Sequence, residues 1–379
     1  MKVMFDHQIF SVQAYGGYTK YFVALARALR ATDGVQAQIV APAHVNEYLQ
    51  RADAPGAFSF RMRSPRRGLK HRPLLTAPLF RLAAALGRPD VIHETHHILR
   101  GGHLPRGVPV VATCHDMILE RHGGGADAIA RKRAALERAD AIVCISQSTR
   151  NQLLARYPHL QSRASVVHHG VDPAAPYAAV ALELPIPYVL FVGTRGGYKN
   201  FATALQALGS SSALHDDFHL VCFGGGPFTA AEREQARRAG LPEKRLLHIS
   251  GSDELLAHAY RHAAALLYPS LEEGFGMPLT EAMVQGCPVL CGRTSCFPEI
   301  CGDAAMYFDD PADVGSMRHA LDTLLGDDAQ RAHLAQLGRL RAAAFTWQAC
   351  AAGTAAAYRS ALGARGAASL TTAIQKPQP

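Results

Sequence analysis

Residues 268–288 read Y-P-S-L-E-E-G-F-G-M-P-L-T-E-A-M-V-Q-G-C-P. The run that leads into this stretch, from Ala263 to Tyr268, is apolar enough to form a buried strand. From Pro278 onward the apolar residues recur at the spacing of a short helix, which Gly286 ends. The stretch therefore predicts a strand, a loop and a helix in succession, which is the repeating unit of an α/β fold.

Two carboxylates stand out in this stretch, because Glu273 falls on the predicted loop and Glu281 falls in the first turns of the predicted helix. Backbone N–H groups freed by the glycines and by the helix N-terminus point into the space between them. Such a place suits a ligand with a phosphate and many hydroxyls, since amides bind the anion and carboxylates bind the hydroxyls. On these two acids alone, an ordinary strand–loop–helix connection with surface acids is equally consistent.

The pair of glutamates with seven residues between them, inside E-G-F-G-M-P-L-T-E-A, resembles the donor-sugar motif of the retaining GT-B glycosyltransferases of family 4. The resemblance implies two Rossmann-like domains that face each other across a cleft, with a C-terminal helix that crosses back to the first domain. It implies that Glu273 and the amides near Gly276 and Met277 hold the sugar hydroxyls. Pro278 belongs to the same motif, and Glu281 is expected to bind the ribose.

Other segments match the same family in order. The glycine loop before the helix predicted from Tyr18 is expected to face the cleft at Gly17, and His115, at the end of a predicted strand, is expected to contact the donor sugar. The loop T-R-G-G-Y-K-N at residues 194–200 carries two cations, which suit a diphosphate. The resemblance assigns them to the donor diphosphate, and the expected catalytic set is His115, Arg195, Lys199 and Glu273. Tyr198 departs from the commonest family pattern, which has arginine there.

A chain of 379 residues is too long for one typical core and suits two domains. The proline-rich run from Pro173 to Pro187 is the predicted linker. We expect an acceptor-binding domain at residues 1–177, a donor-binding domain at 178–345, a returning helix at 346–362 and a disordered tail at 363–379.

The composition is that of a globular protein, with 48% hydrophobic and 18% charged residues and no run of 18 apolar residues. The apolar start before Asp6 is too short for a signal-peptide core, so we expect a cytoplasmic protein. The eight cysteines include no C-x-x-C pair and are expected to be buried thiols. The literal H-E-x-x-H at residues 93–97 requires a helix to bind zinc, whereas the apolar residues before it predict a strand.

No D-x-D occurs in the sequence, so no paired carboxylates are available to hold a divalent cation on a diphosphate. Lys199, Arg195 and helix dipoles would then have to neutralise the leaving group. We expect no metal site and no cofactor besides the nucleotide-sugar substrate.

The positive charge is concentrated in the first part of the chain. Residues 1–177 hold 23 Lys and Arg against 12 Asp and Glu, whereas the remainder holds 16 against 19. Six basic residues fall between Arg61 and Arg72, just before the apolar run from Leu74 to Leu86. This pattern is typical of a face that touches an anionic membrane, although a solvated loop beside a core helix fits equally well. No nucleic-acid partner is expected.

The resemblance implies a retaining enzyme that moves a hexose from a nucleotide sugar to a growing glycan or a lipid-diphosphate-linked oligosaccharide. No residue is placed as a covalent nucleophile, so we expect front-face substitution. The opening F-D-H-Q-I-F and the loop T-R-G-G-Y-K-N look similar to bacterial enzymes of surface-polysaccharide assembly, such as O-antigen and lipopolysaccharide synthesis, which favours GDP-mannose or a related GDP-deoxyhexose. A sugar-nucleotide epimerase or phosphorylase of the same architecture, or a non-catalytic nucleotide-sugar-binding protein, remains as an alternative.

Overall fold

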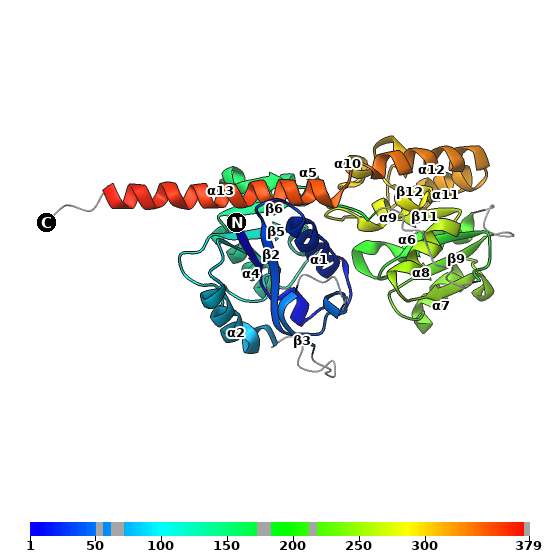
Figure 1. Cartoon of the computed structure of the whole chain (residues 1–379). Coiled ribbons are helices and arrows are strands. Elements are labelled where there is room, and N and C mark those ends of the chain that lie inside the picture. The colour runs from blue at the N-terminus through cyan, green and yellow to red at the C-terminus, as the bar shows by residue number, and fades with distance from the viewer. Residues whose placement is uncertain (51–55, 62–71, 173–182, 212–217, 375–379) are drawn as a thin grey trace. The chain divides into compact units, whose positions relative to one another are not determined.

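The computed structural model describes the chain except for residues 51–55, 62–71, 173–182, 212–217 and 375–379 (Figure 1). The chain divides into two compact units. Unit 1 comprises Met1–Gly170 together with the segment from Trp347 onward, and unit 2 comprises Val171–Thr346. The two units are described separately below.

The centre of unit 1 is a seven-stranded parallel sheet in the order β3-β2-β1-β4-β5-β6-β7. Its strands are β1 (Lys2–Phe5), β2 (Gln36–His44), β3 (Gly56–Arg61), β4 (Val91–Glu94), β5 (Val110–Cys114), β6 (Ala141–Cys144) and β7 (Ala164–Val166). The chain builds outward from β1 to β3 and then returns to the other side of β1 with β4. This reversal is the mark of a Rossmann-like sheet, and it places the loops after β1 and β4 side by side.

Helices cover both faces of this sheet. They are α1 (Gly17–Arg30), α2 (Arg72–Gly87), α3 (Ile118–Arg121), α4 (Ala126–Arg138), α5 (Gln147–Arg156) and α13 (Trp347–Ile374). Val3 and Phe5 point to the face that α1 and α13 cover, whereas Met4 packs with Phe80 of α2 on the opposite face. Ser146 caps α5, because its hydroxyl accepts a hydrogen bond from the Thr149 amide at 3.0 Å.

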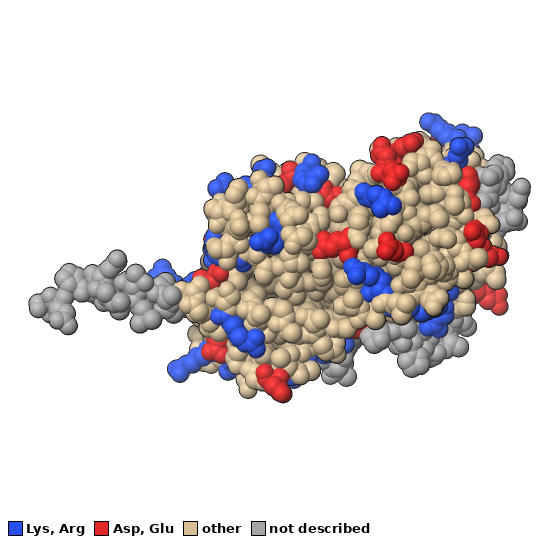
Figure 2. All heavy atoms as spheres, turned by 90° about the horizontal axis from the view of Figure 1, so that it is seen from above, with Lys and Arg blue, Asp and Glu red and all other residues tan. Residues whose placement is uncertain are grey.

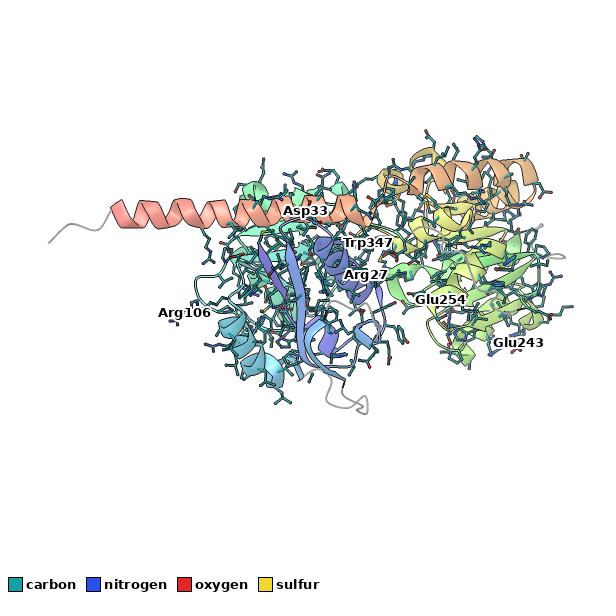
Figure 3. The ribbon with its side chains drawn as sticks, viewed as in Figure 1. Arg27, Asp33, Arg106, Glu243, Glu254 and Trp347 are labelled. Carbon is teal, nitrogen blue, oxygen red and sulfur yellow. The ribbon has the colours of Figure 1, made fainter. Side chains whose placement is uncertain are left out.

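The final helix returns to unit 1, as the sequence predicted (Figures 1 and 3). It begins at Trp347, directly against the backbone of Gly170, where an added Cβ would lie 2.4 Å from the Trp347 nitrogen. Only glycine fits this crossing. Further along, buried alanines let the helix approach the sheet closely, and the Tyr358 hydroxyl lies 2.7 Å from His93 Nδ1.

Unit 2 repeats the same plan with six parallel strands in the order β10-β9-β8-β11-β12-β13. The strands are β8 (Tyr188–Val192), β9 (His219–Phe223), β10 (Leu246–Ile249), β11 (Ala265–Tyr268), β12 (Val289–Gly292) and β13 (Ala305–Phe308). Here the chain reverses direction between β8 and β11, and loops that follow neighbouring strands at such a point form the usual ligand site of an open α/β sheet.

The helices of unit 2 are α6 (Phe201–Ser210), α7 (Ala230–Arg238), α8 (Asp253–His262), α9 (Met277–Gln285), α10 (Phe297–Cys301), α11 (Val314–Leu325) and α12 (Asp328–Ala342). Residues from α6, α7, α11 and α12 share one core cluster with the sheet. The helix predicted after the glutamate motif is α9, and it ends at Gly286, which adopts a left-handed conformation with φ of 71°.

The predicted α/β class with two Rossmann-like domains is confirmed. Helix α13 continues to Ile374 rather than stopping near 362, and so covers most of the segment predicted as a disordered tail; its alanine-rich sequence has no proline before residue 377. The predicted boundary at 177–178 and most of the basic run from Arg61 to Arg72 lie outside the described residues. In the described part of the chain, no helix is long and apolar enough to cross a membrane.

Candidate functional site

The loops after β8 and β11 meet at the reversal point of unit 2. The Leu271 amide donates to the Tyr198 carbonyl at 2.8 Å, and the Asn200 side-chain amide donates to the Pro269 carbonyl at 3.2 Å. These bonds bring Lys199 and Glu273 together, with 2.5 Å between the Lys199 ammonium and Glu273 Oε1. Both side chains keep a small exposed fraction, 14% for the lysine and 12% for the glutamate. The pair thus forms a charged, partly buried group where a ligand is expected.

The position of Glu273 is set by a residue that the sequence analysis did not select. The Glu273 amide donates to Ser295 Oγ at 3.1 Å, and the same hydroxyl donates to the Glu273 carbonyl at 2.8 Å. Ser295 itself has φ of 56°, an uncommon value for a residue with a side chain. Tyr268 also contributes, because burial, and then the neighbouring Glu273 carboxylate, raise the pKa of its phenol well above the ordinary value. The phenol therefore stays a hydrogen-bond donor.

The glycine motif forms the start of α9, as predicted. Gly276 caps the helix with φ of 81° and packs against Leu279, so a residue with a Cβ would be strained there. Met277 and Pro278 follow as the first two helical residues and leave the N-terminal amides of the helix at this loop. Glu281 lies one turn further on, where the Tyr260 hydroxyl donates to its carboxylate at 3.3 Å.

Arg195 has a different environment from Lys199. Its guanidinium donates to Glu232 of α7 at 2.7 Å and to the carbonyls of Gly224, Gly226 and Pro227 at 3.1, 2.8 and 3.0 Å. It also lies 4.6 Å from the centre of the Phe228 ring. Its side chain is 2% exposed. In this structure, Arg195 holds the glycine loop after β9 in place.

In unit 1, the loop before α1 and the end of β5 also come together. Tyr18, which follows Gly17, stacks on the His115 ring with 4.0 Å between ring centres, and its hydroxyl donates to Asp116 at 2.6 Å. The predicted residues Gly17 and His115 are therefore linked through Tyr18, which the sequence analysis named only as the start of a helix.

His115 is one of several buried imidazoles. Burial, and then the nearby His169, His96 and His93, lower its pKa well below the ordinary value, so the ring is neutral at pH 7. Neither of its ring nitrogens has a hydrogen-bond partner within the protein, although the side chain is buried. A neutral imidazole with both nitrogens unused can donate to or accept from a ligand hydroxyl.

The described residues contain one group whose atoms could converge on a metal ion, formed by Asp6, Glu94 and His103. The Gln8 side-chain nitrogen lies 2.7 Å from Asp6, 3.2 Å from Glu94 and 3.5 Å from His103, and so occupies the centre of the group. Arg138 pairs with Glu94 from the outside. Because the Gln8 amide, His103 and Arg138 already contact these carboxylates, the group fits a structural polar network better than a metal site, although Glu94 Oε2 has no hydrogen-bond partner within the protein. The H-E-x-x-H run is strand and loop, as predicted.

The remaining predicted residues divide between the units. Unit 2 holds one continuous region formed by Lys199, Glu273, Gly276, Met277, Pro278 and Glu281. Arg195 of the same unit is turned toward α7. Unit 1 holds Gly17 and His115, which lie together. All eight cysteines are free and buried, as expected.

Comparison with known proteins identifies both halves of the chain. Residues 15–175 match Glycosyltransferase Family 4, and residues 181–341 match Glycosyl transferases group 1. The chain is 32% identical over 176 residues to the O-antigen chain mannosyltransferase B of Escherichia coli, which covers 45% of each protein. It is 31% identical to the D-inositol 3-phosphate glycosyltransferase 1 of Catenulispora acidiphila over 74% of this chain and 75% of that one. Sucrose-phosphate synthase from Thermosynechococcus elongatus shares the fold, with a TM-score of 0.75 at 21% identity over 96% and 99% of the two chains.

The environment of Arg195 predicts a role in stability. Removing one partner of this partly buried pair should lower the free energy of unfolding by about 1–3 kcal/mol, because the other charge is left without its partner. The effects of Arg195→Met and Glu232→Gln on the free energy of unfolding, measured in urea, should therefore not add up in the double variant. The exposed pair of Arg237 and Glu234 on the same helix is the matched control, and Arg237→Met should leave the unfolding midpoint unchanged. Additive effects of Arg195→Met and Glu232→Gln would contradict the assignment.

The buried histidines predict loss of stability in acid. Burial lowers the pKa of His169 from 6.5 to about 3. Above pH 6.5 His169 is neutral in both the folded and the unfolded chain, so its contribution to the free energy of unfolding is fully present. Below pH 6.5 this histidine is protonated only in the unfolded chain, so the free energy of unfolding falls by up to about 1.4 kcal/mol per pH unit. His169→Phe keeps the stacking on Tyr21, at 4.4 Å between ring centres, and should reduce this slope by one proton. Urea unfolding between about pH 4.5 and 6.5, which lies inside the window between these two pKa values, measures the slope. An unchanged slope would refute the prediction.

Proposed function

This chain belongs to the GT-B glycosyltransferases, and from that premise we propose that it transfers a hexose with retention of configuration. The proposed donor is GDP-mannose or a related GDP-deoxyhexose, and the proposed acceptor is a growing glycan or a lipid-diphosphate-linked oligosaccharide. The similarity to an O-antigen mannosyltransferase supports the choice of sugar and of surface-polysaccharide assembly. The observation that carries the proposal is the contact of Lys199 with Glu273 at the reversal point of the unit 2 sheet.

The chemistry follows from what these two groups can offer a nucleotide sugar. The bond between the anomeric carbon and the diphosphate breaks, and negative charge develops on the leaving oxygen, where the Lys199 ammonium stabilises it. Glu273, held by Ser295, accepts hydrogen bonds from the sugar hydroxyls. An acceptor hydroxyl then attacks from the same face of the ring and loses its proton to the departing phosphate. No covalent intermediate is required.

The other predicted residues are assigned to the nucleotide and the sugar. Glu281 is one helical turn beyond Gly276 and is assigned to the ribose hydroxyls, whereas the amides that begin at Met277 are assigned to the sugar or phosphate oxygens. His115 of unit 1 is neutral and offers both ring nitrogens to the sugar. Gly17 is assigned to the donor on the strength of its place before α1.

The proposed location is the cytoplasm, at the inner face of the cytoplasmic membrane. Eight buried free thiols without any disulfide fit a reducing compartment. The excess of basic residues in the first 177 residues fits an anionic leaflet, at which a lipid-linked acceptor would be found.

The proposal is tested by screening GDP- and UDP-sugars for protection against thermal unfolding, because a ligand that binds only the folded state raises the midpoint. The sugars that protect are then assayed for transfer to lipid-diphosphate-linked oligosaccharides. We expect the largest shift with GDP-mannose or a GDP-deoxyhexose, followed by transfer with an unchanged anomeric configuration. Donor hydrolysis without any transfer would favour the epimerase class, and tight binding without turnover would favour a non-catalytic protein.

The two glutamates should differ in their kinetic effects. Glu273→Gln should lower kcat by about 10²–10³, as expected for one preorganised polar contact with the reacting sugar. Glu281→Ala should mainly raise the donor KM, because it removes a contact that does not change during the reaction. Initial rates over a range of donor concentrations separate the two. Glu234→Gln on the exposed face of α7 is the control, and wild-type turnover in Glu273→Gln would exclude its assigned role.

The absence of a D-x-D sequence leads to a prediction about metals. Transfer should continue in excess chelator, because Lys199 supplies the positive charge that a divalent cation supplies in other enzymes. Lys199→Met should then lower the rate far more than chelator does. Loss of activity in chelator that Mg²⁺ or Mn²⁺ restores would show that the diphosphate is neutralised in another way.

A further inference from the structure

The outer face of α2 is unusually apolar for an exposed surface. Eight large hydrophobic side chains are exposed in the described part of the chain, and five of them are leucines of this one helix. They are Leu74, Leu75, Leu79, Leu82 and Leu86, with exposed fractions from 48% to 77%. Single exposed leucines are ordinary, whereas a contiguous set on one element marks an interaction surface.

The spacing shows that these leucines form one stripe. Leu75, Leu79, Leu82 and Leu86 follow the i, i+4, i+7, i+11 pattern, which places them along one side of a helix. The opposite side is already used, because Phe80 and Ala84 are buried against the sheet. The fold of unit 1 therefore needs only the inner face of α2, and the outer stripe has no role in the core.

The charges around the stripe are mostly positive, with the exposed Asp90 just after the helix as an exception. Helix α2 contains no Asp or Glu, Arg81 and Arg88 are exposed, and the Lys2 ammonium donates to the Gly87 carbonyl at the end of the helix at 2.7 Å. Arg106 lies on the same side of unit 1 (Figure 3), on the loop whose Leu104 and Val108 pack against the α2 cluster. Unit 1 as a whole holds 26 Lys and Arg against 11 Asp and Glu, a net charge of +15. On the face drawn in Figure 2, which is seen from above, basic and acidic side chains are interspersed.

We propose that the outer face of α2 docks on an anionic lipid surface, with its leucines inserted among the acyl chains and its arginines at the headgroups. Apolar side chains flanked by basic residues are what a helix lying in the membrane interface requires. The 16 residues of α2 span only about 24 Å and include Arg81, so the helix lies in the interface rather than across it. This inference rests on the proposed function only in that such a surface would bring the enzyme to the membrane that holds a lipid-linked acceptor.

A second copy of the chain fits the same stripe less well. Stable protein interfaces bury about 800 Å² on each partner. Five exposed leucines on one helix are few beside the roughly 20–30 residues that each partner contributes to such an interface. Two copies would also bring two strongly basic units together, which costs electrostatic free energy.

The decisive experiment compares vesicle binding by the full-length wild type with that of a variant carrying Leu75→Ser, Leu79→Ser and Leu82→Ser. These side chains are exposed, so the substitutions should not affect folding, which circular dichroism and thermal unfolding would verify. On vesicles of equal phosphatidylglycerol and phosphatidylethanolamine, the variant should bind at least about 100-fold more weakly. Leu340→Ser is the matched control, because Leu340 is 68% exposed but lies on α12 of unit 2, and it should bind as the wild type does.

Insertion is distinguished from mere surface attraction by two further measurements. A tryptophan introduced as Leu79→Trp should shift its emission to the blue on these vesicles, whereas Leu340→Trp should not; the native Trp347 is buried and supplies a constant background. Added salt should weaken the binding but leave the blue shift of the bound fraction intact, because screening acts on the arginines and not on buried leucines.

The proposal fails if the wild type ignores anionic vesicles at low salt, if the triple variant binds as well as the wild type, or if no blue shift occurs. A wild-type dimer in sedimentation velocity that the triple variant converts to a monomer would assign the stripe to a second copy. Donor protection in thermal unfolding is measured on the same variants. Normal protection without vesicle binding would overturn only the docking, whereas vesicle binding without protection by any donor would overturn only the proposed function.

Discussion

The parallel pairing of β8 with β11 is the constraint on which the candidate site depends. These strands are neighbours in the sheet but are separated in the chain by β9, β10 and three helices. Parallel strands end at the same edge, so the loops that follow them must meet there. The Leu271–Tyr198 and Asn200–Pro269 hydrogen bonds then fix the two loops against each other. Lys199 and Glu273 can approach to 2.5 Å only because this backbone contact has already been made.

The two cations of the loop after β8 have separate physical roles. Arg195 is planar and has five donors, and most of these are used on Glu232 and on loop carbonyls in a buried setting. Lys199 has a flexible stem and a compact charge, and it reaches a carboxylate that still has some exposure to solvent. Arginine therefore suits the rigid framework and lysine suits the place where a charged ligand arrives.

Aromatic and imidazole packing joins the elements of unit 1, beside partly buried ion pairs at its loop edge such as Arg138 with Glu94. Tyr21 stacks on His169, Tyr18 stacks on His115, and His93 bridges Thr113 and the Tyr358 hydroxyl of the returning helix. Burial keeps these imidazoles neutral, so they can pack like aromatic rings while retaining polar nitrogens. This arrangement ties α13 to the strand that ends at Glu94, and so links the end of the chain to the first sheet.

The sequence alone determined the α/β class, the alternation of most strands and helices, and the residues of the glutamate motif, because these depend on local periodicity and on glycine and proline at element ends. It did not indicate the strand at Gly56–Arg61 or the extension of α13 to Ile374, since neither has a strong local signal. Only the tertiary structure showed that Ser295 holds Glu273, that Tyr18 joins Gly17 to His115, and that Arg195 turns toward α7. It also showed which side of α2 is exposed, because a helix that is apolar all round carries no periodic signal to say which face the sheet will cover. Contacts between distant segments depend on strand order, and strand order is a property of the folded chain.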